Sequence, residues 1–174
     1  TTYNDLVSFI PSLKNIRQPN LARLGNIYYK GNFTGFINDF VTYGTLRSDL
    51  GTATTDINMK LPENRPPAYS GRLNTENFRL GAFMGTDELG NISLSGAVKG
   101  SGFTLKDLNA NFNGSIKQIE FNDYNFRNIE LNGKFEKKQF NGHLTIDDPN
   151  LKINSLDGML SLAGKKEIAF NLNA

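Results

Sequence analysis

Most of the chain alternates apolar and polar residues with a period of two, and one short unit built on this alternation recurs. The unit is a large apolar residue, any second residue, and then glycine. It occurs at Tyr69–Gly71, Leu94–Gly96, Phe112–Gly114, Leu131–Gly133, Phe140–Gly142 and Leu156–Gly158. In a strand the first and third residues share a face, so each glycine lies on the apolar face. There it leaves room for a large neighbour on the adjacent strand, or for strong curvature of the sheet.

Turn-forming residues are unusually frequent: the 174 residues include 17 Gly and 23 Asn. Both residue types tolerate positive φ, so many tight reversals are expected. Several strands look about 10–13 residues long, well above the usual length. These features predict an all-β fold, mainly an antiparallel meander of long strands that forms a curved open sheet or groove. The intervals between the glycines are irregular, so the chain is a loose repeat and not a strict solenoid.

The first residues follow a different period. Leu6, Phe9, Ile10 and Leu13 recur at helical spacing, Thr2 or Asn4 can cap the helix, and Pro11 breaks or kinks it. We expect a short N-terminal helical segment and linker over residues 1–23 and a single β domain over residues 24–174. The helix is interpreted as packing on a sheet face or capping its open end, in preference to acting as a lipid-contacting plug. The whole is interpreted as a segment of a longer repetitive polypeptide.

Changes in the parity of the alternation predict irregular points in the strands. Ile116 and Ile119 have opposite parity, which predicts a bulge near Lys117 or Gln118. A strand is expected to begin at Phe36, and a loop without regular structure is expected over residues 81–90.

The composition excludes several classes of function. The absence of Cys excludes disulfides, thiolate metal sites and cysteine nucleophiles. The net charge of +2 and the lack of a basic cluster do not favour a nucleic-acid partner. Tyr28, Tyr29, Phe33 and Phe36 could form a stacking platform, but the basic groove that single-stranded DNA requires is missing.

No residue pattern indicates catalysis, a cofactor or a metal site. His143, the only His, is expected to be solvated on the polar face, without the partners that a triad or metal site needs. Asp147 and Asp148 are adjacent at a strand end and point in opposite directions, so turn chemistry explains them better than paired catalytic carboxylates do. The sequence therefore predicts a protein that is not an enzyme.

A sheet with one apolar face must cover that face with another layer, a ligand or a bilayer. The apolar residues of the most regular third of the chain are the candidates for lining a groove. They are Phe112, Ile116, Ile129, Leu131, Phe135, Phe140, Leu144, Ile146, Leu160 and Leu162. The alternative is that the same residues form the core of a closed sandwich, and the sequence leaves both interpretations open.

The stretch Leu94–Gly164 resembles the repetitive β-rich region of TamB-like proteins in the AsmA superfamily. The matching text comprises "GSGFTLKDLNA", "YNFRNIELNGKF", "FNGHLTIDDPNLKI" and the apolar–x–Gly units, and "YKGNFTGFINDFVTYGTLRSDLGTATTDINMKL" has the same style. The resemblance covers the chain from about Leu24 onward. Each motif is weak alone, and their order along the chain gives the resemblance its specificity.

The resemblance implies a long sheet folded lengthwise into an apolar groove, the β-taco. It implies a periplasmic location in the envelope of a Gram-negative bacterium, with the full-length protein anchored in the inner membrane. The implied ligands are phospholipid acyl chains moving between the two membranes, and a TamA-like barrel protein of the outer membrane is the implied partner. The family brings no catalytic motif and no cofactor. The alternative function is a scaffold for outer-membrane protein assembly that pairs an edge strand with a partner, without bound lipid.

Overall fold

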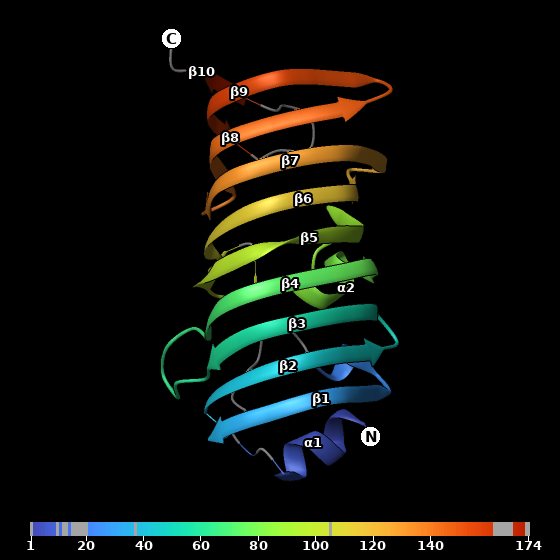
Figure 1. Ribbon diagram of the computed structural model, residues 1–174, viewed down its shortest axis with the longest axis vertical. Helices are drawn as coiled ribbons and strands as arrows, with labels where there is room; N and C mark the ends of the chain where they lie inside the picture. The colour runs from blue at the N-terminus through green and yellow to red at the C-terminus, as the bar shows by residue number, and fades with distance from the viewer. Residues whose placement is uncertain are drawn as a thin grey trace.

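The structure, a computed structural model, describes residues 2–9, 11, 14, 21–36, 38–104, 106–161 and 169–172. Within these residues, ten antiparallel strands form one sheet whose spatial order is the order of the chain (Figure 1). The strands are β1 (Ile27–Phe36), β2 (Asp39–Ser48), β3 (Gly51–Lys60), β4 (Ala68–Arg79), β5 (Leu89–Ser101), β6 (Asn109–Phe121), β7 (Tyr124–Glu136), β8 (Gln139–Asp148), β9 (Leu151–Ser161) and β10 (Ala169–Leu172). The prediction of an all-β antiparallel meander of long strands in an open sheet is confirmed.

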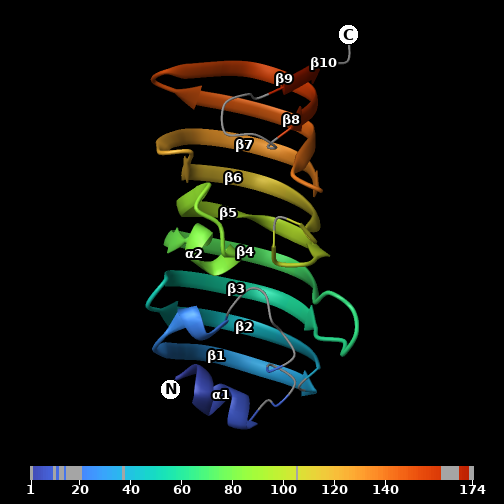
Figure 2. The same ribbon diagram turned by 180° about the vertical axis from the view of Figure 1, so that it is seen from behind.

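Three short helical elements accompany the sheet. They are α1 (Tyr3–Phe9), the 3-10 helix η2 (Leu21–Leu24) and α2 (Leu80–Met84). The strands are bowed, and η2 and α2 lie on their concave side (Figure 2). Thr2 and Asp5 cap α1 reciprocally, since the Asp5 carboxylate accepts a hydrogen bond from the Thr2 N–H at 2.7 Å and the Asp5 N–H donates to the Thr2 hydroxyl at 3.4 Å. The predicted N-terminal helix therefore exists and ends before Pro11, whereas Ile10 and Leu13 lie outside the described residues.

Pairing in register across nine strands aligns the alternating residues into rows that run along the length of the sheet. One such row is Phe33, Thr42, Ile57, Gly71, Val98, Phe112, Gly133, Gly142 and Gly158. We call the face that carries this row the inner face. The opposite, outer face carries the row Asn32, Tyr43, Asp56, Arg72, Ala97, Asn113, Asn132, His143 and Asp157. The sheet is therefore apolar on one side and mainly polar on the other.

Glycines on the inner face lie beneath aromatic rings, which explains the recurring apolar–x–Gly unit. A Cβ atom on Gly96 would lie 2.6 Å from Cζ of Phe112, and one on Gly133 would lie 2.6 Å from Cε2 of Phe140. Directly paired residues reproduce the arrangement, because Phe112 is opposite Gly133 and Leu131 is opposite Gly114. The expectation that glycine makes room for a large neighbour is confirmed.

Two irregularities fall where the parity of the alternation changes. In the β5–β6 ladder Ser93 pairs with Gln118 and Leu94 with Ile116, so Lys117 is an extra residue; in the β6–β7 ladder Lys117 and Asn128 are both left out of the pairing. Asn128 has φ of 51°, a left-handed conformation that Asn tolerates better than most residues. The predicted bulge near Lys117 is confirmed. It keeps apolar residues on the inner face on both sides of the irregular point.

Two sequence-based boundaries are wrong. The strand expected to begin at Phe36 begins at Asp39, because Phe36 is the last residue of β1 and Asn38 lies in a turn. The expected loop over residues 81–90 contains α2, which covers little more than one turn. Helical periodicity is not visible over so short a segment. The helix ends at Gly85, whose φ of 74° is left-handed and whose N–H donates to the Gly81 carbonyl at 2.8 Å.

Burial of the inner face is uneven along the sheet. One hydrophobic cluster runs from Leu24 and Ile27, at the start of β1, to Leu156 of β9, and in it Phe140 is only 2% exposed. The α2 residues Leu80, Ala82 and Phe83 pack against this cluster. At the β1 end of the sheet, Tyr29 and Phe33 on the inner face of β1 are exposed. The core therefore reaches the first residue of β1, Ile27, and the rest of the β1 inner face is open to solvent.

The ring-over-glycine packing predicts the effect of adding one methyl group. Gly133→Ala should lower the free energy of unfolding by about 1–3 kcal/mol, because the new Cβ would overlap the Phe140 ring and the carbonyl oxygen of Asn141. Asn132→Ala changes the neighbouring outer-face residue, which is exposed, and should stay within about 0.5 kcal/mol of the wild type. Urea unfolding followed by circular dichroism measures both. Equal stability of the two variants would contradict this account of the glycines.

Candidate functional site

Eight of the ten candidate groove residues can be placed, and all eight lie on the inner face within the same hydrophobic cluster. Six are buried, and Phe135 and Ile146 are partly buried. The six are Phe112, Ile116, Ile129, Leu131, Phe140 and Leu144. The side chain of Leu160 and the whole of Leu162 lie outside the described residues. The structure thus brings the candidates together, as a packed surface shielded from water.

The apolar side chains that remain open to solvent are concentrated on β1 and β2. On the inner face Phe33 is 47% exposed and contacts Phe40, with 4.6 Å between the ring centroids. On the outer face the large apolar side chains of these two strands are exposed as well. They are Tyr28, Phe36, Val41 and Tyr43. An exposed apolar patch of this kind marks an interaction surface more often than scattered single residues do.

Tyr28, Tyr29, Phe33 and Phe36 stand out in the sequence as candidates for a stacking platform, but nothing in the sequence marks Tyr29 and Phe33 as the accessible end of the apolar face. Their parity was visible, since Tyr29 and Phe33 have the same parity as Ile27. The solvent exposure of Tyr29 and Phe33 depends on which segments pack against β1. The periodicity of the sequence does not contain this information. Val41 and Tyr43 alternate with Thr42 and Gly44, and this alternation was the only signal that could have placed them on the outer face.

Aromatic side chains connect α2 to the edge of the inner face where β4 begins. Phe83 of α2 packs edge-to-face on Phe78 and Phe103, with centroids 5.7 and 6.0 Å away, and Phe103 stacks on Tyr69 at 5.1 Å. The Tyr69 hydroxyl donates to the Gly102 carbonyl at 3.1 Å, and burial raises the pKa of Tyr69 to about 12. This aromatic cluster holds α2 against the middle of the sheet. Because its pKa is raised, Tyr69 stays protonated at physiological pH.

The outer face carries a shallow depression of about 400 Å³ over β3 to β6. Its lining includes Lys60, Lys99, Asn58, Asn109 and Asn111. Lys60 is paired with Asp39 at 2.9 Å, so part of the positive charge is neutralised. The depression is polar and open, and its chemistry is that of a hydrated sheet surface.

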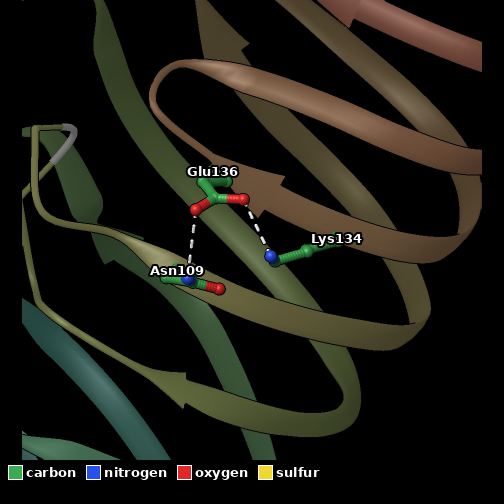
Figure 3. Close-up of polar contacts among 3 residues, drawn as sticks. All are labelled: Asn109, Lys134 and Glu136. Carbon is green, nitrogen blue, oxygen red and sulfur yellow. Dashed lines mark hydrogen bonds and ion pairs between the residues drawn. The ribbon is translucent and has the colours of Figure 1, made fainter.

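Next to this depression, three side chains from β6 and β7 form a polar ladder (Figure 3). The Glu136 carboxylate accepts hydrogen bonds from Lys134 Nζ at 2.7 Å and from Asn109 Nδ2 at 3.2 Å. The hydrogen bond and positive charge of Lys134 lower the pKa of Glu136. The Asn109–Glu136 hydrogen bond joins the two strands, and a cross-strand polar pair stabilises a sheet modestly.

His143 is exposed on the outer face, as predicted, but the expectation that it has no partner is wrong. Its directly paired neighbour on β9 is Asp157, whose Oδ1 lies 2.9 Å from His143 Nδ1. Parity therefore does bring a carboxylate to the histidine, across the strand and not along it. Within the described part of the chain, no group of three or more His, Asp or Glu residues is close enough to hold a metal ion.

Asp147 and Asp148 separate as predicted. Asp147 is exposed and pairs with Lys152 at 3.1 Å, whereas Asp148 is only 1% exposed. The buried carboxylate accepts hydrogen bonds from the Tyr124 hydroxyl at 2.5 Å, the Asn150 N–H at 2.9 Å and the Arg127 N–H at 3.0 Å. The hydrogen bond from Tyr124 is the largest cause that lowers the pKa of Asp148, and the two backbone hydrogen bonds lower it further. The same Tyr124–Asp148 hydrogen bond raises the pKa of Tyr124. Asp148 therefore ties the β8–β9 turn to the start of β7.

Comparisons with known proteins give no assignment: no family model matches the chain, and neither a curated protein nor a solved structure matches it. Among the helices of the described residues, none has the length and apolar character needed to cross a membrane.

The hydrogen bonds to Asp148 predict a pH dependence of stability. Because the pKa of Asp148 in the folded protein is below the unfolded value of 3.8, its contribution is complete above that value and is lost as the pH falls through the folded pKa. Asp148→Asn should therefore unfold at a temperature that changes less with pH between about pH 5 and 2 than the wild type does. Thermal unfolding at a series of pH values measures this.

The neighbouring variant Asp147→Asn is the control. Its carboxylate is exposed and pairs with one lysine, so stability at pH 7 should remain within about 0.5 kcal/mol of the wild type. An acid-induced loss of stability that is as steep in Asp148→Asn as in the wild type would contradict the role given to Asp148.

Proposed function

We propose that this sheet is a non-enzymatic lipid-binding segment, and that phospholipid acyl chains lie on its inner face with their head groups in water. The observation that carries the proposal is a single apolar face that continues in register from β1 to β9 and is exposed to solvent at β1. The proposal extends the resemblance of Leu94–Gly164 to TamB-like proteins of the AsmA superfamily.

The inner face has the length that an acyl chain needs. Ten strands have nine intervals, which at ~4.8 Å each give an extent of about 43 Å along the sheet. Rows of apolar side chains and glycines run in that direction, across the strands. An extended acyl chain lying along a row would meet apolar atoms over its whole length, without any requirement for a particular head group.

The energetic benefit of such a surface is large. Exposing one CH₂ group to water costs about 0.8 kcal/mol, so a chain of sixteen carbons faces a barrier on the order of 10 kcal/mol if it crosses water uncovered. A continuous apolar surface removes most of this barrier without any chemical step. Transport along such a surface requires only that the lipid can enter and slide.

The β1–β2 end is the accessible part of this surface. Phe33 and Tyr29 are exposed there, whereas the inner residues of β6 to β8 are packed on one another. We therefore assign first contact with the acyl chain to Phe33 and Tyr29, with Phe40 beside them. The eight groove candidates that the structure places on the later strands continue the surface, and a chain that reaches them must part the packed side chains.

The setting that this function implies is the periplasm of a Gram-negative bacterium. There the chain would form part of a longer envelope protein anchored in the inner membrane, and would pass phospholipid towards the outer membrane. A TamA-like barrel protein is the partner proposed at the outer membrane.

Two phenylalanines of β1 provide a matched test, since Phe33 lies on the inner face and Phe36 on the outer face, where it is 81% exposed. The protein is incubated with vesicles of phosphatidylethanolamine and phosphatidylglycerol, separated from them, and examined by native mass spectrometry. Bound phospholipid is expected on the wild type and on Phe36→Asn. Phe33→Asn should retain at least tenfold less, because a polar amide then interrupts the apolar row.

Substitution of a buried residue such as Phe140 would not serve, because it would cost about 3–5 kcal/mol of stability and confuse unfolding with loss of binding. A wild-type protein that retains no phospholipid, or equal loss of phospholipid from the Phe33 and Phe36 variants, would reject the proposal. A lipid-free protein that captures an outer-membrane protein would favour the scaffold function instead.

A further inference from the structure

The edge strand β1 has the features of a pairing surface. Within the described residues its strand partner is β2 alone, so the backbone groups along its other side have no ladder. Natural edge strands are usually short, charged, bulged or interrupted by Pro. In contrast, β1 has ten residues, no Pro and one charged residue, Lys30, and all of its residues except Ile27 are exposed.

The inner residues of β1 alternate large and small: Tyr29, Gly31, Phe33 and Gly35. Elsewhere in the sheet, several pairs place a large side chain opposite a glycine, beside other pairs that join two glycines, such as Gly133 and Gly142, or two rings, such as Phe135 and Phe140. Phe40 is opposite Gly35, Tyr69 is opposite Gly100, and Phe112 is opposite Gly133. A strand that extends the large-to-glycine pairing across β1 would present large residues opposite Gly31 and Gly35, and glycines opposite Tyr29 and Phe33.

A second copy of β1, running antiparallel, meets this requirement in one register. We propose that β1 pairs with β1 of a second copy of the chain about a two-fold axis through Asn32. The pairs are Tyr28–Phe36, Tyr29–Gly35, Lys30–Thr34, Gly31–Phe33 and Asn32–Asn32. Each ring of the inner face then meets a glycine, and on the outer face Tyr28 meets Phe36.

Neighbouring registers lack this complementarity. A shift of two residues in one direction places Phe33 opposite Phe33, and a shift in the other places Tyr29 opposite Phe33. A larger shift places Lys30 opposite Lys30, a like-charge pair that destabilises a sheet. Shifts by one residue are excluded because they place inner residues opposite outer ones.

The pairing has a consequence for the shape of the assembly. Directly opposed residues of an antiparallel pair point to the same side, so the two inner faces lie on the same side of one continuous sheet. The contact is two-fold, since each copy contributes the same strand. Two copies therefore complete it, and no filament forms through this contact. The exposed inner residues Tyr29 and Phe33 lie at the centre of the joined apolar surface. The pairing does not depend on whether lipid binds there.

The helix α1 lies alongside the first half of this edge (Figures 1 and 2), so full pairing requires α1 to turn away. The helix has seven residues, and of its side chains that the structure describes Val7 alone is buried. We therefore expect a dimer that forms reversibly in proportion to concentration, and not an obligate one.

Sedimentation equilibrium of the lipid-free full chain tests the proposal. The wild type should be in monomer–dimer equilibrium. Asn32→Lys places two lysines opposite each other on the axis and should weaken the dimer about fivefold, whereas Thr34→Glu places a carboxylate opposite Lys30 twice and should tighten it about tenfold. Both residues are exposed on the outer face, so neither change disturbs the monomer core.

Single cysteines test the register, because the natural chain has none. Asn32→Cys should form a disulfide-linked dimer on mild oxidation, since directly opposed residues lie within the distance a disulfide spans. Asn113→Cys, an exposed outer-face position in the middle of the sheet, is the control and should cross-link far more slowly. Tyr28→Cys and Phe36→Cys should cross-link when mixed, and much less when each is alone.

Several results would overturn the proposal. A chain that stays monomeric at every concentration, or equal cross-linking of the Asn32 and Asn113 variants, excludes pairing through β1. Adsorption of a strictly monomeric chain to phospholipid vesicles would reassign the exposed aromatic residues to a lipid surface. Failure of lipid binding by a dimeric protein would leave this proposal standing and reject only the proposed function.

Discussion

The packing of large side chains over glycines on the inner face is the interaction on which the rest of this structure depends. In the described part of the chain there is one sheet, and α2 packs against only part of its inner face. Apolar side chains must therefore cover one another across neighbouring strands. Rings do so by lying over glycines of the adjacent strand, as Phe112 lies over Gly96 and Phe140 over Gly133.

Because inner side chains are covered by their neighbours on adjacent strands, the sheet has a buried middle and an exposed end at β1. A side chain in the middle is covered from both neighbouring strands, and from β6 to β8 the large inner residues are buried or partly buried. On β1 a side chain has a neighbouring strand on one side only, so Phe33 and Tyr29 remain exposed. Both proposals concern this end of the sheet because the same lack of a neighbour leaves apolar atoms and backbone hydrogen-bonding groups open together. An acyl chain can cover the apolar atoms. A paired strand can cover the apolar atoms and also form hydrogen bonds with the backbone groups.

The polar side chains of the outer face stabilise the sheet by joining neighbouring strands. The ladder of Asn109, Lys134 and Glu136 joins two neighbouring strands, and His143 and Asp157 join another pair. Asp148, in contrast, has the parity of the inner residue Ile146 and is buried, and a carboxylate shielded from water is stable only when hydrogen-bond donors surround it. Tyr124 and two backbone N–H groups supply those donors, and the turn after β8 is held in place as a result.

The sequence by itself determined the class of the fold and the face on which each residue lies, including the bulge at Lys117, because the pleat of a strand imposes a strict period of two. The side shared by Phe112, Leu131 and Phe140 follows from that period. Only the tertiary structure decided which inner residues are exposed, that Asp157 lies beside His143, and that residues after Arg79 form a helix. These three properties depend on the register between strands and on the segments packed over the strands. Neither produces a periodic pattern in the sequence.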